Sequence, residues 1–477
     1  MKKHKISELF LYRHRFGIGY FLLSIAFTTV LFLMPLISPS GLSEAEMQST
    51  VDSYSLDFNS MLNGNIVDLP YRALQKVSIR LFGLSAYSIS LPSIIIGLFL
   101  GVLLILLLNR WFKNTVALIA SILTVLSAPF LYLVGFGTPL IMLVFWPTLL
   151  LWLGSKIQGV NKPRTSYCFL FALALFLSVF TPYMIYLAVF IFIYAMTHPH
   201  LRFTIKNLPK IPFFIATLIV ITGTGLIIYN AIKYPNIATE LLFTNDFSFR
   251  HFFSNISTGF LPFFSWTGNV ESTLLAPMIG LANIALAIAG LISTTKGFFA
   301  SRNSIATLLI VFTLLITGFT PDCAILIILP LAILTAHGIR YILEKWYNLF
   351  PENPYARIFA IFPIGLFLGI IIISSTSHYI FGYRYNPTVA NEFNDDLALI
   401  RENLAENTTL VIQDGTLEYD FYHILDNTTN FKVTTTFNTA SAPIATLGKW
   451  PNAQNHQIDR IITSSKSTNS DRIYIYK

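Results

Sequence analysis

The sequence predicts an α-helical polytopic membrane protein with about eleven transmembrane helices and a small α/β domain at its C-terminus. Of its 477 residues, 54% are hydrophobic and only 11% are charged, whereas about 25% are charged in an average soluble domain. Stretches free of Asp, Glu, Lys and Arg recur along the first 377 residues, many of them near the roughly 17 to 25 residues that cross a bilayer. After residue 379 hydrophobicity falls, and segments of helical and strand type alternate.

The expected spans are separated by turns that carry Pro, Gly or charge, such as FGTP (136–139) and FTPDC (319–323). They are 16–38, 88–109, 114–132, 138–154, 166–180, 183–197, 211–230, 273–294, 304–320, 323–336 and 358–377. The first is basic and then apolar like a signal peptide, but its apolar run is longer than a signal peptide needs. We therefore expect it to be retained as a span.

The distribution of Lys and Arg predicts the orientation of the chain, because positive loops stay on the cytoplasmic side. With the N-terminus inside, the inner segments hold eighteen Lys and Arg residues and the outer loops before the C-terminal tail hold five. An odd number of spans then places the C-terminus outside, in a protein of the cell membrane. The same asymmetry explains most of the net charge of +8, so no nucleic-acid partner is expected.

Two domains are expected. Residues 1–378 form the transmembrane domain, in which two long outer loops (39–87 and 231–272) carry most of the exposed chain. Residues 379–477 form the extracytoplasmic α/β domain, with helices expected near 391–404 and 418–426 and strands near 408–414, 431–437 and 472–477. Because the inner loops are short, the function is expected to face outward.

The first outer loop begins with an acidic motif, GLSEAEM (41–47), directly after the first span. Ser43 followed by Glu46 has the spacing of a capping box, and Glu44 would then lie in the first helical turn, where the helix dipole favours a negative charge. Carboxylates at this place are equally suited to hold a general base on the outer face of a membrane. The motif alone leaves both interpretations open.

The order of motifs after it resembles the C-type membrane glycosyltransferases, the superfamily of protein O-mannosyltransferases and lipid A aminoarabinose transferases. The similarity lies in GLSEAE, in the segment RLFGLSAYSISLPS and in the turn LSAPFLYLVGFGTP, within residues 15–155. It implies transfer of a hexose or pentose from a polyprenyl-phosphate carrier. The acceptor would be a protein, a lipid or a wall polymer on the outer face.

In that family an Asp-Glu-Ala motif in the first outer loop supplies the base that activates the acceptor. One alignment register places Glu46 on the Glu of this motif, and the other places Glu44 there, while neither keeps the Asp. The resemblance therefore implies that Glu46 or Glu44 is the base. Residues i and i+2 of a helix point about 200° apart, so only one of them can face the acceptor.

The family's Lys-Pro pair near the carrier phosphate is replaced here by Leu69-Pro70. Arg72, Lys76 and Arg80 follow at intervals of four, which places them on one face of an amphipathic helix on the membrane surface. They are candidates for binding the donor phosphate, although such residues also extend toward lipid headgroups without binding substrate.

The second outer loop is rich in aromatic residues and contains the adjacent pair Arg250 and His251. This pair is a candidate for binding phosphate, and Trp266 for stacking on a sugar or lipid, although aromatic residues at this depth also anchor proteins at the interface. Asp322 is expected to be a solvated helix cap. No cluster of residues requires a metal, so no cofactor is expected, and a divalent metal is left open.

Two other functions are considered beside a glycosyltransferase. A transporter or flippase usually has ionisable residues inside its spans, and the expected spans contain no Asp, Glu, Lys or Arg. A catalytically inactive scaffold with a transferase fold would be consistent with the missing Asp of the motif.

Overall fold

The computed structural model describes most of the chain, and all structural statements below concern the described residues. These are residues 15–37, 41–57, 66–157, 165–242, 250–264, 279–295, 301–349, 355, 359, 361–385, 392–404, 408–428, 431–437, 443–450, 457–463 and 472–476.

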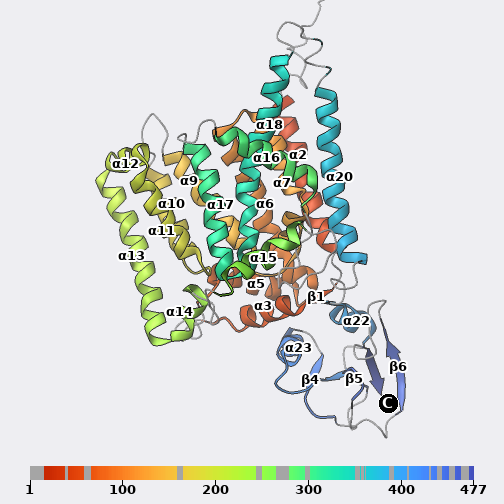
Figure 1. The fold of residues 1–477 in the computed structure, drawn as a ribbon. Coiled ribbons are helices and arrows are strands. Elements are labelled where there is room, and N and C mark those ends of the chain that lie inside the picture. Colours follow the sequence, from red (N-terminus) through yellow and green to blue (C-terminus); the bar gives the residue numbers. More distant parts are fainter. Residues whose placement is uncertain are drawn as a thin grey trace, which may run out of the picture.

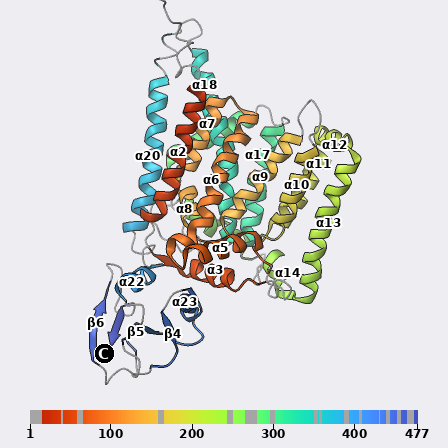
Figure 2. The ribbon, with the colours of Figure 1, turned by 180° about the vertical axis from the view of Figure 1, so that it is seen from behind.

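A bundle of apolar helices makes up most of the molecule (Figure 1). In a helix the backbone N–H and C=O groups form hydrogen bonds with one another. A segment inside a bilayer needs this, because no water is present there to pair with them. The members are α2 (Arg15–Ile37), α6 (Ala86–Trp111), α9 (Ile141–Ile157), α10 (Thr165–Ser178), α11 (Met184–Thr197), α13 (Lys210–Lys233), α16 (Leu281–Thr295), α17 (Ser301–Phe319), α18 (Ile328–Leu349) and α20 (Ile361–Tyr385). Helix α20 lies beside α2 at one edge of the bundle, and α13 lies at the opposite edge (Figures 1 and 2).

The protein is a membrane protein with several spans, as predicted. Among the described residues, six helices are long and apolar enough to cross a membrane, or seven if one bent pair is a single span. Four shorter apolar helices, α9, α10, α11 and most of α16, lie where further spans were expected. The count of eleven and the inside-outside orientation stay predictions.

One expected span is not a continuous helix. Residues 114–132 were expected to form one span, but α7 (Asn114–Val125) and α8 (Ala128–Gly135) are bent by 60° at a break between them. Pro129 lies in the first turn of α8, where a residue without an N–H cannot continue the preceding helix. The expected segment is therefore helical but divided at this break, and whether the pair forms a single span stays a prediction.

Short helices cover one end of the bundle. They are α3 (Glu44–Tyr54), α5 (Leu69–Phe82), α14 (Pro235–Leu242) and α15 (Phe252–Phe264). Helices α3, α5 and α14 lie at the end that carries the C-terminal α/β fold (Figures 1 and 2), and we call this the domain end. The short helix α12 (Pro199–Lys206) lies at the other end of the bundle.

The C-terminal part folds around a five-stranded mixed sheet in the order β4-β3-β5-β7-β6. Strand β3 (Thr409–Val411) is parallel to β4 (Lys432–Thr434) and β5 (Ile444–Leu447), and β7 (Ile473–Tyr476) is antiparallel to β5 and to β6 (Ile458–Ile462). Helices α22 (Asp396–Asn403) and α23 (Leu417–Thr428) accompany it. The two helices and three strands expected from the sequence are confirmed, whereas the sequence interpretation missed β5 and β6. The domain boundary at residue 379 stays a prediction.

The α/β fold is joined to the domain end through shared backbone and side-chain contacts. Strand β1 (Leu42–Ser43), next to the acidic motif, pairs antiparallel with β2 (Phe393–Asn394). Gly41 permits this close approach, because its φ is +96° and a Cβ there would lie 2.6 Å from the carbonyl oxygen of Asn394. Met47 of α3 and Phe421 of α23 belong to one hydrophobic cluster. The acidic motif is therefore held between the bundle and the C-terminal fold.

Candidate active site

The acidic motif forms the capping box that its spacing predicts. Ser43 caps α3 and accepts a hydrogen bond from the Glu46 N–H at 3.3 Å. The Glu46 Oε2 atom in turn accepts hydrogen bonds from the Ser43 N–H at 3.0 Å and from the Ser43 hydroxyl at 3.1 Å. The structural interpretation of Glu46 is thus confirmed.

The second carboxylate oxygen of Glu46 binds the turn between α8 and α9. The Gly137 N–H donates to Glu46 Oε1 at 2.7 Å, and the side chain is only 3% exposed. Burial raises the pKa of Glu46 to about 7, although the hydrogen bonds from Ser43 and Gly137 oppose this rise. Both oxygens of Glu46 therefore have donors, and the carboxylate fixes the turn that contains Gly137.

Gln75 continues this buried network from α5. Its amide nitrogen donates to the carbonyl oxygens of Ile89 at 3.1 Å and Gly137 at 2.9 Å. Its amide oxygen accepts from the hydroxyls of Ser49 and Ser53 on α3. A fully buried amide that satisfies four neighbours joins α3, α5, α6 and the 136–139 turn into one unit. We call Ser43, Glu46, Gly137 and Gln75 the capping network.

Glu44 lies in the first turn of α3 and is exposed. The two acidic residues of the motif therefore differ in environment, as their spacing predicts. A role for either residue as the base stays a proposal.

Helix α5 is amphipathic, and it has three distinct faces. Tyr71, Gln75 and Ile79 are buried against the bundle, and Leu74, Val77 and Leu81 form an exposed apolar face. The cationic residues lie on a third face. This arrangement is typical of a helix at a membrane interface.

The three cations of α5 have different partners. Arg72 forms an ion pair with Asp52 of α3 at 2.9 Å, and Lys76 donates to the carbonyl oxygen of Leu56. Partial burial and the neighbouring Arg80 lower the pKa of Lys76, and Arg80 itself is exposed. Their role in binding a phosphate stays a proposal.

The candidate residues of the second outer loop do not lie with those of α3 and α5. Arg250 and His251 are exposed just before α15, and neither lines the cavity described next. Trp266 lies outside the described residues.

The domain end contains a cavity of about 470 Å³, which we call the domain-end cavity. It lies where the loops before α5, α9, α11 and the 3-10 helix η2 (Pro321–Ile327) meet α14. Three carboxylates and several hydroxyls line it, together with apolar side chains. The lining residues are Val67, Asp68, Pro139, Leu140, Leu143, Thr181, Pro182, Tyr183, Thr239, Glu240, Thr320, Asp322 and Cys323.

Backbone hydrogen bonds between distant segments hold the walls of this cavity. The Asp68 N–H donates to the Phe180 carbonyl at 2.8 Å, and the Tyr183 N–H donates to the Leu241 carbonyl at 3.0 Å. The Thr320 hydroxyl donates to the Tyr183 hydroxyl at 2.7 Å. Asp68 and Tyr183 are also the only non-glycine residues with positive φ among those described, at 52° and 64°. Such conformations often accompany functional sites.

Asp68 is the buried carboxylate of the cavity. It precedes α5 at the N-cap position, but its side chain makes no capping hydrogen bond. The residue is 7% exposed, and its Oδ1 atom has no hydrogen-bond partner among the described residues. Burial raises the pKa of Asp68 to about 7, opposed by Arg72 and reinforced by Glu240 and Asp52.

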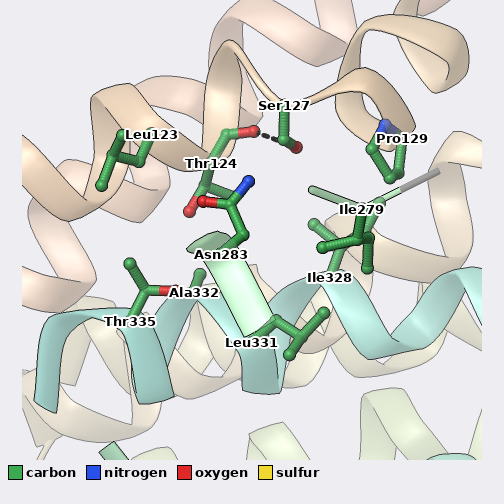
Figure 3. Close-up of a pocket in the computed structure, with 10 residues that line it drawn as sticks. All are labelled: Leu123, Thr124, Ser127, Pro129, Ile279, Asn283, Ile328, Leu331, Ala332 and Thr335. Atoms are coloured by element: carbon green, nitrogen blue, oxygen red, sulfur yellow. Dashed lines mark hydrogen bonds between the residues drawn. The ribbon is translucent and has the colours of Figure 1, made fainter. Parts of the chain in front are cut away.

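A second pocket lies inside the bundle at the break between α7 and α8 (Figure 3). Its volume of about 40 Å³ suits a few water molecules and not a sugar. Asn283 points toward Thr124 and Ser127 there, and the Ser127 hydroxyl donates to the Thr124 carbonyl. Within the described ranges, no group of three or more His, Cys, Asp or Glu residues is arranged to hold a metal ion.

The sequence interpretation did not single out Asp68, Tyr183, Thr320 or Glu240, and it treated Asp322 as a solvated cap. Asp68-Leu69-Pro70 has the pattern of an ordinary helix start, in which Asp caps and Pro begins the helix. The unused capping role is visible only in the structure, because it depends on the left-handed backbone at Asp68.

The chain is similar to known proteins in part of its sequence and in its fold. A family model described as dolichyl-phosphate-mannose-protein mannosyltransferase matches residues 70–228. The crystal structure of ArnT from Cupriavidus metallidurans bound to undecaprenyl phosphate is similar with a TM-score of 0.55 at 12% identity, covering 96% of this chain and 98% of that one. The resemblance to the C-type membrane glycosyltransferases is confirmed. The apo state of ArnT from the same organism gives a TM-score of 0.52 with the same identity and coverage.

Other similarities are weaker. Archaeal oligosaccharyltransferase AglB from Archaeoglobus fulgidus, in complex with an inhibitory peptide and a dolichol-phosphate, has a TM-score of 0.45 at 11% identity, covering 90% of this chain and 66% of that one. This value is too low to indicate a common fold. No curated protein sequence matches the chain.

Proposed function

We propose that the protein is a membrane glycosyltransferase that moves a sugar from a polyprenyl-phosphate carrier to an acceptor on the outer face of the cell membrane. The domain-end cavity carries this proposal, because it combines a volume suited to a sugar with carboxylates and hydroxyls beside an interfacial helix. The ArnT-like fold and the mannosyltransferase family model support it.

The lysine and arginine asymmetry supports placing the domain end outside. The C-terminal α/β fold, α3, α5 and α14 all lie at this end (Figure 1). A polyprenyl carrier in the outer leaflet would then reach the cavity from the exposed apolar face of α5. The acceptor would enter from the aqueous side.

The chemistry is displacement at the anomeric carbon of the sugar. A carboxylate of the first long loop (39–87) takes the proton of the acceptor, and Glu44 and Glu46 are the candidates from the sequence. Cations of α5, Arg72, Lys76 and Arg80, stabilise the phosphate that leaves. Arg250 and His251 are further candidates for the same role, and Trp266 for stacking on the sugar or lipid.

An inactive scaffold is the second candidate, and one observation favours it. The Glu46 carboxylate is engaged by three donors from Ser43 and Gly137, which is what a purely structural residue would show. A scaffold would bind the carrier without cleaving it.

A turnover assay distinguishes the two candidates. The full-length protein in detergent is mixed with a panel of radiolabelled polyprenyl-phosphate sugars and membrane extract as acceptor, and release of label from the lipid is followed. We expect one sugar to be released by the wild type. Thr239→Trp, which fills the cavity from α14, should abolish release, whereas Asn236→Trp on the exposed side of the same helix should not. Carrier binding without release of any sugar would support the scaffold instead.

A further inference from the structure

We infer that Asp68 is the general base of the domain-end cavity and that it deprotonates a hydroxyl group of the acceptor. This inference rests on the proposed glycosyl transfer and identifies the reacting carboxylate. The capping network, including Glu46, then has a positioning role, because it holds the turn whose Pro139 lines the cavity.

Asp68 and Glu46 differ in whether a carboxylate oxygen is still able to accept a hydrogen bond. A base needs an oxygen that can accept a proton from the substrate within hydrogen-bond distance. Both oxygens of Glu46 already accept hydrogen bonds from protein N–H groups. The Asp68 Oδ1 atom is buried and has no hydrogen-bond partner among the described residues, and the residue lines the cavity. Rotation about the Cβ–Cγ bond exchanges the two oxygens, so the carboxylate can turn its unused oxygen toward the cavity.

The backbone explains why Asp68 does not cap its helix. An N-cap residue normally has extended φ and ψ, which turns its side chain back onto the first N–H groups, as Ser43 does with φ −86° and ψ 161°. Asp68 has φ 52° and ψ 26°, so its carboxylate is not used by the helix. The left-handed conformation is unfavourable for most residues, and its hydrogen bond to Phe180 helps to hold it.

The other two carboxylates of the cavity are less suited to act as the base. Glu240 is exposed on α14, and Asp322 is half-buried in the first turn of η2. Burial raises the pKa of Asp68 to about 7, near the pH at which a general base both remains partly ionised and binds the incoming proton well. Glu240 and Asp322 lie at the cavity wall, where they can contact hydroxyl groups of a sugar.

The reaction balances without a further reactant. The acceptor O–H gives its proton to Asp68 while its oxygen forms a bond to the anomeric carbon. The bond between that carbon and the phosphate oxygen breaks, and its electron pair leaves with the polyprenyl phosphate. Asp68 later passes the proton to water at the open side of the cavity.

The test compares Asp68→Asn with Glu240→Gln, Asp322→Asn and Asp57→Asn. Asparagine tolerates the left-handed backbone as well as aspartate does, so Asp68→Asn removes the ionisable group and keeps the shape. Asp57 is an exposed carboxylate of the same loop that does not line the cavity. Turnover of the labelled donor and the stabilisation by polyprenyl phosphate alone are both measured on full-length protein.

We expect Asp68→Asn to lower kcat by about 10²- to 10⁴-fold while stabilisation by polyprenyl phosphate stays at the wild-type level. Asp57→Asn should retain wild-type turnover. Retention of more than about a tenth of wild-type kcat by Asp68→Asn would overturn the assignment, as would a larger loss in Glu240→Gln or Asp322→Asn. A wild-type protein that turns over no sugar would overturn the proposed function and the assignment together.

Discussion

Glu46 and Asp68 are two buried carboxylates in the same loop, and both have a pKa raised by burial to about 7. They differ in what surrounds their oxygens. Glu46 is enclosed by donors from Ser43 and Gly137, whereas one oxygen of Asp68 has no hydrogen-bond partner among the described residues and Asp68 lines a cavity. The comparison teaches that burial and a shifted pKa do not by themselves identify a reacting group, because unused hydrogen-bonding capacity is also needed.

The largest expected effect on stability comes from removing the centre of the capping network. Gln75→Leu leaves the Gly137 and Ile89 carbonyls and two serine hydroxyls without their partner. Each unpaired buried group costs about 1 to 3 kcal/mol, so we expect a loss of about 2 to 4 kcal/mol after neighbouring groups adjust. Thermal unfolding in detergent measures it. Gln48→Leu on the exposed side of α3 is the control, and equal loss in both variants would contradict a special role for the network.

The turn at Gly137 should be nearly as sensitive. A Cβ at this position would lie 2.6 Å from Ile89 Cγ2 and 3.2 Å from Glu46 Oε1. Gly137→Ala should therefore destabilise the protein by about 1 to 3 kcal/mol and reduce turnover through the displaced wall of the cavity. Gly225→Ala, where no atom lies within 4 Å of the added Cβ, is the matched control for the same thermal measurement.

Much of the transmembrane fold could be predicted from the sequence, and the site could not. Apolar length sets the spans, and the pattern of Ser43 and Glu46 is local, so the helices and the capping box were both predictable. The break before α8 depends on one proline in an otherwise apolar stretch. The cavity brings together Asp68, Tyr183, Glu240 and Asp322, which lie far apart in sequence and meet only through tertiary packing.

Replacing each carboxylate, Asp68 or Glu46, by its amide should affect the stability of the protein differently. For a carboxylate whose folded pKa lies above its unfolded value, stability is greatest at low pH and falls as pH rises toward the folded pKa. At pH 8 both Asp68→Asn and Glu46→Gln remove this unfavourable charge. Glu46→Gln also disturbs the hydrogen bonds that Ser43 and Gly137 donate to its two oxygens, whereas Asp68 Oδ1 accepts none from the described residues. We expect Asp68→Asn to be at least as stable as the wild type and about 1 to 2 kcal/mol more stable than Glu46→Gln. Equal stability of the two variants in thermal unfolding would contradict the difference.

The smallest expected effect on stability comes from removing the ion pair beside the cavity. Arg72→Ala removes the pair with half-exposed Asp52, which should change stability by less than about 1 kcal/mol. Arg72 lowers the pKa of Asp68, so its removal should move the acid limb of the turnover profile to higher pH. A shift to lower pH in the variant's pH profile would be the opposite of the expected sign.

The pH dependence of turnover tests the central claim most directly. The charged groups that act on Asp68 are Arg72 on α5, Glu240 on α14 and Asp52 on α3, and Asp322 of η2 lines the same cavity. If Asp68 is the base, turnover of the wild type should fall about tenfold per unit below a midpoint of about 7. Glu46→Gln should keep this limb, and the residual turnover of Asp68→Asn should lack it. A limb that Glu46→Gln abolishes and Asp68→Asn retains would contradict the account.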